Sequence, residues 1–128
     1  MSDERSVLFV EDEDLIREAT ADELEDAGYD VVVVDSGDAA LDALDGDAEP
    51  FSVLVTDINL GDGPDGWETG KRARELDGEI PVIYMTGASG HEWQDKGVPN
   101  SVLIAKPFRP SEIIAAIARL LKKVVRRS

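Results

Sequence analysis

Five short apolar runs rich in β-branched residues recur along the chain and constrain its fold more than any other feature. They are Ser6–Val10, Val31–Val34, Phe51–Thr56, Ile80–Met85 and Val102–Ala105. None of them alternates between apolar and polar residues, and continuous apolar runs are typical of strands in a sheet that is covered on both faces. The pattern therefore predicts five buried strands.

Stretches with helical patterning separate these runs. Each predicted helix has a capping residue, a glycine or a proline at one end: Asp14–Ala27 before Gly28, Asp38–Leu44 after Ser36, Trp67–Leu76 before Asp77–Gly78, and a last helix from Pro110. Glycine and proline interrupt the interval Gly87–Asn100, which predicts at most a short helix there. The alternation favours one (βα)₅ domain over residues 1–128, a doubly wound sheet of five parallel strands with a weak fourth helix.

Composition excludes several classes of protein. The 128 residues include no cysteine and one histidine, His91, which argues against disulfide frameworks, thiolate metal sites and Ser–His–Asp catalysis. We expect His91 to be an exposed loop residue. No run approaches the roughly 18 apolar residues of a membrane span, and the N-terminus MSDERSV lacks a signal-peptide core. These features favour a soluble, cytoplasmic protein.

Charge is unevenly distributed along the chain. The 13 basic and 28 acidic residues give a net charge of −15, which argues against direct binding to nucleic acid or an anionic membrane. Residues 1–70 carry 2 basic and 22 acidic side chains, whereas residues 71–128 carry 11 basic and 6 acidic ones. A basic stripe on the last helix is a solvated face, a docking face for an acidic partner or the start of a link to an output domain; it comprises Arg119, Lys122, Lys123 and Arg126.

Polar residues follow four of the predicted strands at the point where each strand ends. They are Glu11 and Asp12 after the first, Asp57 after the third, Thr86 after the fourth and Lys106 after the fifth. Each alone is compatible with a helix cap, a turn or a solvated charge. The carboxyl ends of parallel strands form one edge of a sheet, where ligands bind in open α/β folds. Their joint placement therefore predicts a functional site.

The chemistry of this set points to phosphoryl transfer with a hard cation. Three gathered carboxylates repel one another unless a proton or a cation joins them, and oxygen-only ligands favour Mg²⁺. An aspartate carboxylate can attack phosphorus to form an acyl phosphate, and a lysine and a hydroxyl can contact the phosphoryl oxygens. A flavin or nucleotide site would need a Gly-rich loop after the first strand, but the acidic sequence Glu11–Asp14 occupies that place.

At these positions the chain closely resembles the receiver domain of two-component response regulators, over roughly residues 5–125. Four motifs carry the resemblance: Val10–Glu11–Asp12, Val55–Thr56–Asp57–Ile58–Asn59–Leu60, Met85–Thr86–Gly87 and Lys106–Pro107–Phe108. The resemblance implies a flavodoxin-like receiver fold and a phosphoacceptor switch whose only chemistry is its own phosphorylation and dephosphorylation. The phosphoryl donor would be a sensor histidine kinase or a histidine phosphotransfer protein; the output partner is not indicated.

The resemblance also implies a role for each site residue. Asp57 would be the phosphoacceptor, and Thr86 and Lys106 would contact the phosphoryl group. Glu11, Asp12, Asp57 and the backbone carbonyl of Asn59 would hold Mg²⁺. A cis peptide bond is expected before Pro107.

The chain departs from most receivers three residues before Lys106, where Leu103 replaces an aromatic switch residue. The motif Tyr84–Met85–Thr86–Gly87 instead resembles an atypical subset with an aromatic residue on the fourth strand. For this chain we hypothesise that phosphorylation acts by ordering Gly87–Asn100. Trp67 is expected to pack in the core, and Trp93 either covers the core or contacts a partner.

Two other functions compete with the switch. A phosphohydrolase of the haloacid-dehalogenase type also uses an aspartate nucleophile, but it places that residue after the first strand with a second aspartate two residues on. Here the central aspartate follows the third strand, and Asn59 stands two residues on. A receiver-like binding module that is never phosphorylated is the second alternative, and the intact Asp57, Thr86 and Lys106 argue against it.

Overall fold

The computed structural model describes residues 5–46, 51–88 and 90–127, with side chains as far as 122. Strands and helices alternate in the order β1 (Ser6–Val10), α1 (Asp14–Asp26), β2 (Asp30–Val34), α2 (Gly37–Asp45), β3 (Val53–Asp57), α3 (Gly66–Leu76), β4 (Val82–Thr86), a 3₁₀ turn η1 (Gly90–Glu92), α4 (Trp93–Lys96), β5 (Val102–Ala105) and α5 (Pro110–Arg127). All strand pairs are parallel, in the order β2-β1-β3-β4-β5. The predicted (βα)₅ fold is confirmed, including a fourth helix of a single turn.

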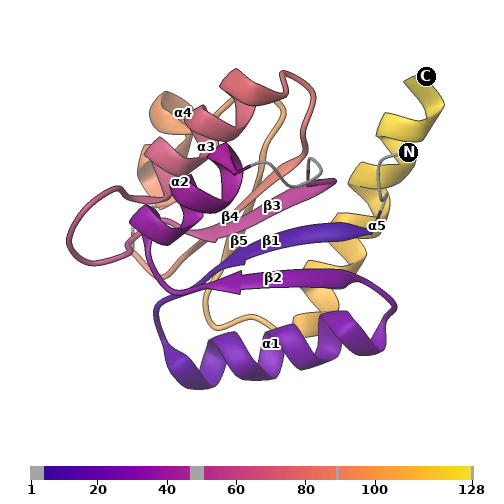
Figure 1. The fold of residues 1–128 in the computed structure, drawn as a ribbon, viewed down its shortest axis with the longest axis horizontal. Coiled ribbons are helices and arrows are strands. Elements are labelled where there is room, and N and C mark those ends of the chain that lie inside the picture. Colours follow the sequence, from indigo (N-terminus) through magenta and orange to yellow (C-terminus); the bar gives the residue numbers. More distant parts are fainter. Residues whose placement is uncertain (1–4, 47–50, 89, 128) are drawn as a thin grey trace.

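Helices cover the sheet on both faces, as Figure 1 shows: α1 and α5 lie on one side, and α2, α3 and α4 lie on the other. Alternate strand residues point to opposite faces, so each strand contributes to two cores. Ile83 and Met85 of β4 pack toward α1 and α5, whereas Val82 and Tyr84 pack toward the other helices. The strand order reverses between β1 and β3, which places the carboxyl ends of these two strands beside each other.

Strands β2 and β5 differ from the prediction of buried strands, because they form the two edges of the sheet. In β5 Ile104 is buried but Ala105 is exposed, and in β2 Val32 and Val33 are 43% and 39% exposed. The continuous valine run of β2 is therefore not a sign of full burial, because an edge position leaves part of each side chain in contact with solvent. Strands β3 and β4 also begin and end later than predicted, and Asp57 and Thr86 are their last residues.

Local capping accounts for several helix ends. Ser36 and Asp65 accept hydrogen bonds from the backbone N–H groups of Ala39 and Glu68, at 3.1 and 2.9 Å, and so begin α2 and α3. Gly28 has a φ of +96° just after α1, a conformation that glycine adopts without a steric penalty. Within the described residues, no helix is long and apolar enough to cross a membrane.

Candidate functional site

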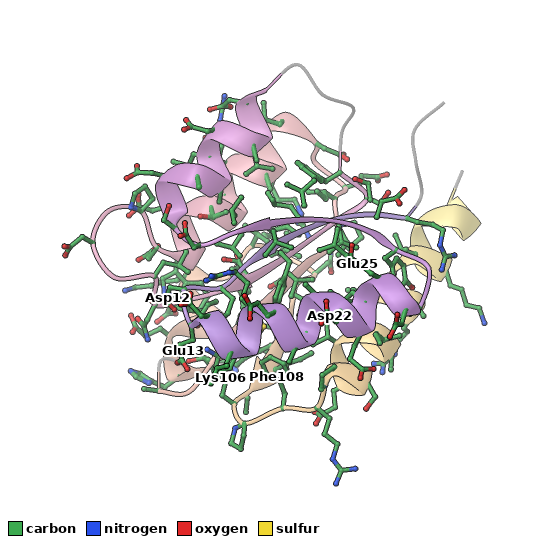
Figure 2. The ribbon with its side chains drawn as sticks, turned by 60° about the horizontal axis from the view of Figure 1, so that its bottom comes forward. Asp12, Glu13, Asp22, Glu25, Lys106 and Phe108 are labelled. Carbon is green, nitrogen blue, oxygen red and sulfur yellow. The ribbon has the colours of Figure 1, made fainter. Side chains whose placement is uncertain are left out.

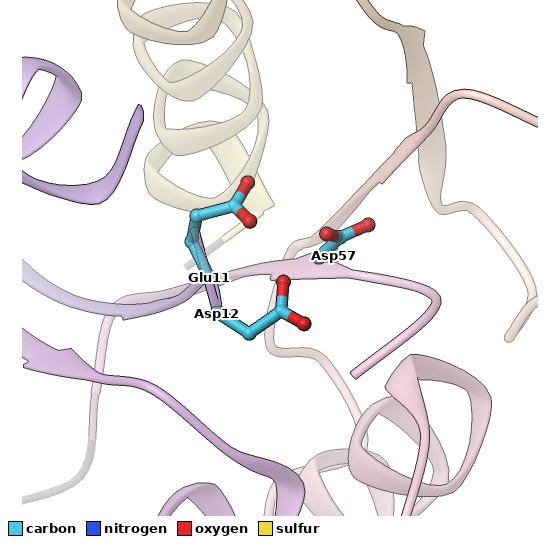
Figure 3. A group of neighbouring side chains, drawn as sticks. All are labelled: Glu11, Asp12 and Asp57. Atoms are coloured by element: carbon cyan, nitrogen blue, oxygen red, sulfur yellow. The ribbon is translucent and has the colours of Figure 1, made fainter. Parts of the chain in front are cut away.

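The carboxyl ends of β1 and β3 bring three carboxylates together. One oxygen each from Glu11, Asp12 and Asp57 lie within 4.8 Å of one another, and Figure 3 shows the three side chains converging on a common space. Glu11 is fully buried and Asp57 is 5% exposed, whereas Asp12 is exposed to solvent. The cluster therefore has two buried carboxylates, Glu11 and Asp57, and one solvent-exposed carboxylate, Asp12.

Lys106 lies between the buried carboxylates. Its Nζ atom is 2.9 Å from Asp57 Oδ2 and 2.9 Å from Glu11 Oε1. The following peptide bond to Pro107 is cis, as expected, and the Lys106 N–H donates to the carbonyl of Thr86 at 2.8 Å. Lys106, which follows β5, thus forms ion pairs with Glu11, which follows β1, and with Asp57, the last residue of β3.

Burial and charge shift the proton affinities of this group. The pKa of Glu11 is raised to about 7, chiefly by burial and further by the charge of Asp57, while the interactions with Lys106 and with the Glu13 N–H oppose this rise. Burial lowers the pKa of Lys106, but its interactions with the carboxylates of Glu11 and Asp57 together outweigh this and leave that pKa above its usual value. The site favours a lysine cation beside two carboxylates whose mutual repulsion a second cation would relieve.

The donor set fits a hard divalent cation. Glu11 Oε1 is buried and makes no hydrogen bond among the described residues, although Lys106 approaches it as an ion-pair partner. The other oxygen of the same carboxylate accepts the Glu13 N–H at 3.1 Å. Three carboxylates, no nitrogen or sulfur ligand and an exposed member at Asp12 match the oxygen-rich, partly hydrated coordination that Mg²⁺ prefers.

Thr86 and Asn59 lie on the elements that border the cluster. Thr86 is buried at the end of β4, one residue beyond Met85, which is the register partner of Asp57. Its Oγ atom accepts the N–H of Ala88 at 3.2 Å. Asn59 is exposed and lies two residues after Asp57. The structure thus gathers Glu11, Asp12, Asp57 and Lys106, and places Thr86 on the adjacent strand.

Two positions beside the site were not singled out from the sequence. Arg17 of α1 donates to the carbonyl of Glu11 at 3.1 Å and to Asp14 Oδ1 at 2.6 Å, and it is one of two basic residues among the first 70. Gly66 begins α3 directly behind the phosphoacceptor candidate and donates its N–H to the carbonyl of Ile58 at 2.8 Å. The scarcity of basic residues in the acidic half of the chain could have drawn attention to Arg17. Nothing in the sequence distinguishes Gly66 from the other glycines among the 11.

A side chain at Gly66 would displace the backbone of the site. A Cβ atom there would lie 2.3 Å from the Asp57 carbonyl oxygen, so we expect Gly66→Ala to lower the free energy of unfolding by about 2 kcal/mol in urea titration. Gly78→Ala is the matched control, because a Cβ there meets nothing within 4 Å. Equal stabilities of the two variants would contradict this account of the packing.

Comparison with known proteins agrees with this geometry. The family model of the response regulator receiver domain matches residues 7–118. The chain belongs to this family. It is 32% identical over 119 residues to the response regulator receiver protein CpdR of Brucella abortus, covering 91% of this chain and 97% of that protein. A response regulator receiver protein from Sinorhizobium medicae has a similar crystal structure, with a TM-score of 0.88, 36% identity and coverage of 91% of this chain and 94% of that one.

Some relatives share only part of their length with this receiver domain, and others nearly all of it. The phosphate regulon regulator PhoB of Escherichia coli is 29% identical to this chain over 124 residues. The aligned region covers 94% of this chain but 53% of PhoB. The receiver domain of the Pseudomonas aeruginosa sensor kinase PA1611, crystallised with magnesium in its active-site cleft, has the same fold, with a TM-score of 0.78 and 21% identity over 92% of this chain and 98% of that one. Receiver domains are in general signalling domains of two-component systems.

Proposed function

We propose that this chain is a phosphoacceptor switch of a two-component system and that Asp57 receives the phosphoryl group. The observation that supports it is the position of the Asp57 carboxylate, which lies within 4.8 Å of two further carboxylates and 2.9 Å from a lysine ammonium group at the carboxyl edge of a receiver fold. We also propose that residues 1–128 act as one receiver domain.

The proposed reaction moves a phosphoryl group between two nucleophiles. A carboxylate oxygen of Asp57 attacks the phosphorus atom of a phosphohistidine, and the P–N bond breaks as the O–P bond forms. The electron pair of the broken bond stays on the imidazole nitrogen, which then takes a proton. Lys106 neutralises negative charge beside the new acyl phosphate, and the Thr86 hydroxyl contacts one of its oxygens.

Mg²⁺ is the proposed cofactor, held by Glu11, Asp12, Asp57 and the carbonyl of Asn59. When bound, it neutralises negative charge on the carboxylates and on the incoming phosphoryl oxygens. The protein's own contribution is to fix the ligands: the Glu13 N–H holds one Glu11 oxygen, and β1 and β3 hold the carboxylates side by side. The magnesium in the receiver domain of PA1611 is consistent with this proposal.

The donor is proposed to be a sensor histidine kinase or a histidine phosphotransfer protein, and the output partner is not indicated. The switch chemistry is confined to the chain's own phosphoryl group, without turnover of an external substrate. Neither the phosphohydrolase alternative nor the unphosphorylated binding module is favoured by any contact at the site. The cytoplasmic location expected from the sequence stays a prediction.

Metal dependence tests the proposed site. We expect acetyl phosphate to add one phosphoryl group to the chain in the presence of Mg²⁺, and addition to fall at least about tenfold when a chelator removes the metal, because the carboxylates then repel the incoming phosphoryl oxygens. Intact-protein mass spectrometry measures the addition. The same uptake with and without metal would contradict the magnesium role, and continuous release of phosphate from monoesters would instead support the phosphohydrolase.

A further inference from the structure

Tyr84 is buried two residues before Thr86 and makes contacts that the proposed phosphoryl transfer does not use. Its ring packs against Trp67 of α3, with ring centroids 4.8 Å apart and an interplanar angle of 54°. Its hydroxyl accepts the N–H of Val98 at 3.2 Å. A Cβ atom on Gly70 would lie 2.2 Å from this hydroxyl oxygen, so α3 leaves room for it only because residue 70 is glycine.

A chain of hydrogen bonds continues from Val98 to helix α4. The carbonyl of Val98 accepts the Ser101 hydroxyl at 2.6 Å, and the same hydroxyl accepts the indole N–H of Trp93 at 2.9 Å. Trp93 is the first residue of α4. Gly97 permits this arrangement, because a Cβ atom there would lie 2.4 Å from the indole ring. Both backbone polar groups of Val98 therefore belong to one connection between β4 and α4.

On the N-terminal side of α4, the residues that follow β4 contact Thr86. Its Oγ atom accepts the Ala88 N–H at 3.2 Å, and a Cβ atom on Gly90 would lie 3.4 Å from the Thr86 methyl group and 3.3 Å from Leu103. Alternate residues of a strand point to the same face, so Tyr84 and Thr86 approach the segment from one side of the sheet. The Thr86 hydroxyl thus bonds Ala88 on the N-terminal side of α4, and the Tyr84 hydroxyl bonds Val98 on its C-terminal side.

We propose that Tyr84 is a positioning residue that couples the phosphoacceptor site to helix α4, through the hydrogen-bonded chain that ends at Trp93. The inference rests on the proposed function, because it needs Asp57 to change state. A shift of Thr86 toward a phosphoryl group on Asp57 moves Ala88 and Gly90, and α4 turns about its attachment to Tyr84. This connection runs through Tyr84 of β4, and Leu103 stands at the β5 position where most receivers carry an aromatic residue.

The two tryptophans of the chain, Trp67 and Trp93, allow a direct test. We label the protein with 5-fluorotryptophan, assign the two ¹⁹F resonances with Trp67→Phe and Trp93→Phe, and add beryllofluoride with Mg²⁺ as a stand-in for the phosphoryl group. In the wild-type chain we expect the Trp93 resonance to shift. In Tyr84→Phe, which removes only the hydroxyl, we expect that shift to be lost while phosphoryl uptake from acetyl phosphate stays at the wild-type level.

Two further variants separate coupling from simple stability. Tyr29→Phe removes the other tyrosine hydroxyl of the chain, from the core on the opposite face, and should keep the full Trp93 shift. Ser101→Ala breaks the chain of hydrogen bonds without touching Tyr84 and should lose the shift as Tyr84→Phe does. The turn between α4 and β5, residues 97–101, should stay folded in Tyr84→Phe. Arg74 of α3 still donates to the carbonyl of Pro99 in this turn, at 2.6 Å.

Each outcome decides the inference. A full Trp93 shift in Tyr84→Phe, or no shift in a wild-type chain that does take up a phosphoryl group, would overturn the coupling role and leave the proposed function standing. A wild-type chain that takes up no phosphoryl group under any donor would overturn both, since there would be no change of state to transmit.

Discussion

Asp57→Asn is expected to take up no phosphoryl group from acetyl phosphate or from a phosphorylated histidine donor. An amide has nearly the shape of the carboxylate but is a far weaker nucleophile, so the fold should persist while the chemistry is lost. The measurement is intact-protein mass spectrometry in the presence of Mg²⁺, with the wild-type chain run in parallel. Folding is checked by urea titration, so that a loss of uptake cannot be attributed to unfolding.

Asp62→Asn is the matched control for this substitution. Asp62 is an exposed aspartate in the loop that follows β3, five residues from Asp57 and outside the carboxylate cluster. It should take up the phosphoryl group at the wild-type level. Uptake by Asp57→Asn equal to the wild type would place the acceptor on another side chain, and the proposed function of the cluster would then be wrong.

The fold could be predicted from the sequence because its signals are local and repeated. Four of the five apolar runs were followed by a helical pattern with a capping residue, a glycine or a proline at one end, as at Ser36, and this alternation suffices to predict a parallel sheet. The sequence did not reveal that β2 lies at the edge, because four valines in a row look alike in a central strand and in an edge strand. The burial of a strand depends on its position in the strand order, and the strand order is a property of the whole sheet.

The candidate site could be predicted for a related reason. Parallel strands all end at one edge, so reading the residue after each strand was enough to gather Glu11, Asp12, Asp57 and Lys106 without knowing any distance. The hydrogen bond from Val98 to Tyr84 could not be found in this way. It joins a strand to an irregular turn 14 residues on, and no local sequence pattern indicates which backbone N–H of that turn approaches the buried hydroxyl.

The pH dependence of stability in the metal-free protein should carry the signature of Glu11. The folded chain holds a proton on this buried carboxyl up to a pKa of about 7, against the ordinary glutamate pKa of 4.5 in the unfolded chain. Between these values the folded state binds more protons than the unfolded state, so the free energy of unfolding falls as pH rises. The contribution lost across this window is about 3 kcal/mol, and little more is lost above pH 7.

Glu11→Gln isolates this contribution from the other titrating groups. Glutamine keeps the size of the side chain and cannot ionise, so the difference in unfolding free energy between the variant and the wild type should grow by about 3 kcal/mol from pH 4.5 to 7, in urea titrations with a chelator present. A difference that stays constant with pH would show that Glu11 titrates normally. Added Mg²⁺ should stabilise the wild type more at pH 7 than at pH 5, because the cation binds the ionised carboxylates, and should stabilise Glu11→Gln less at both.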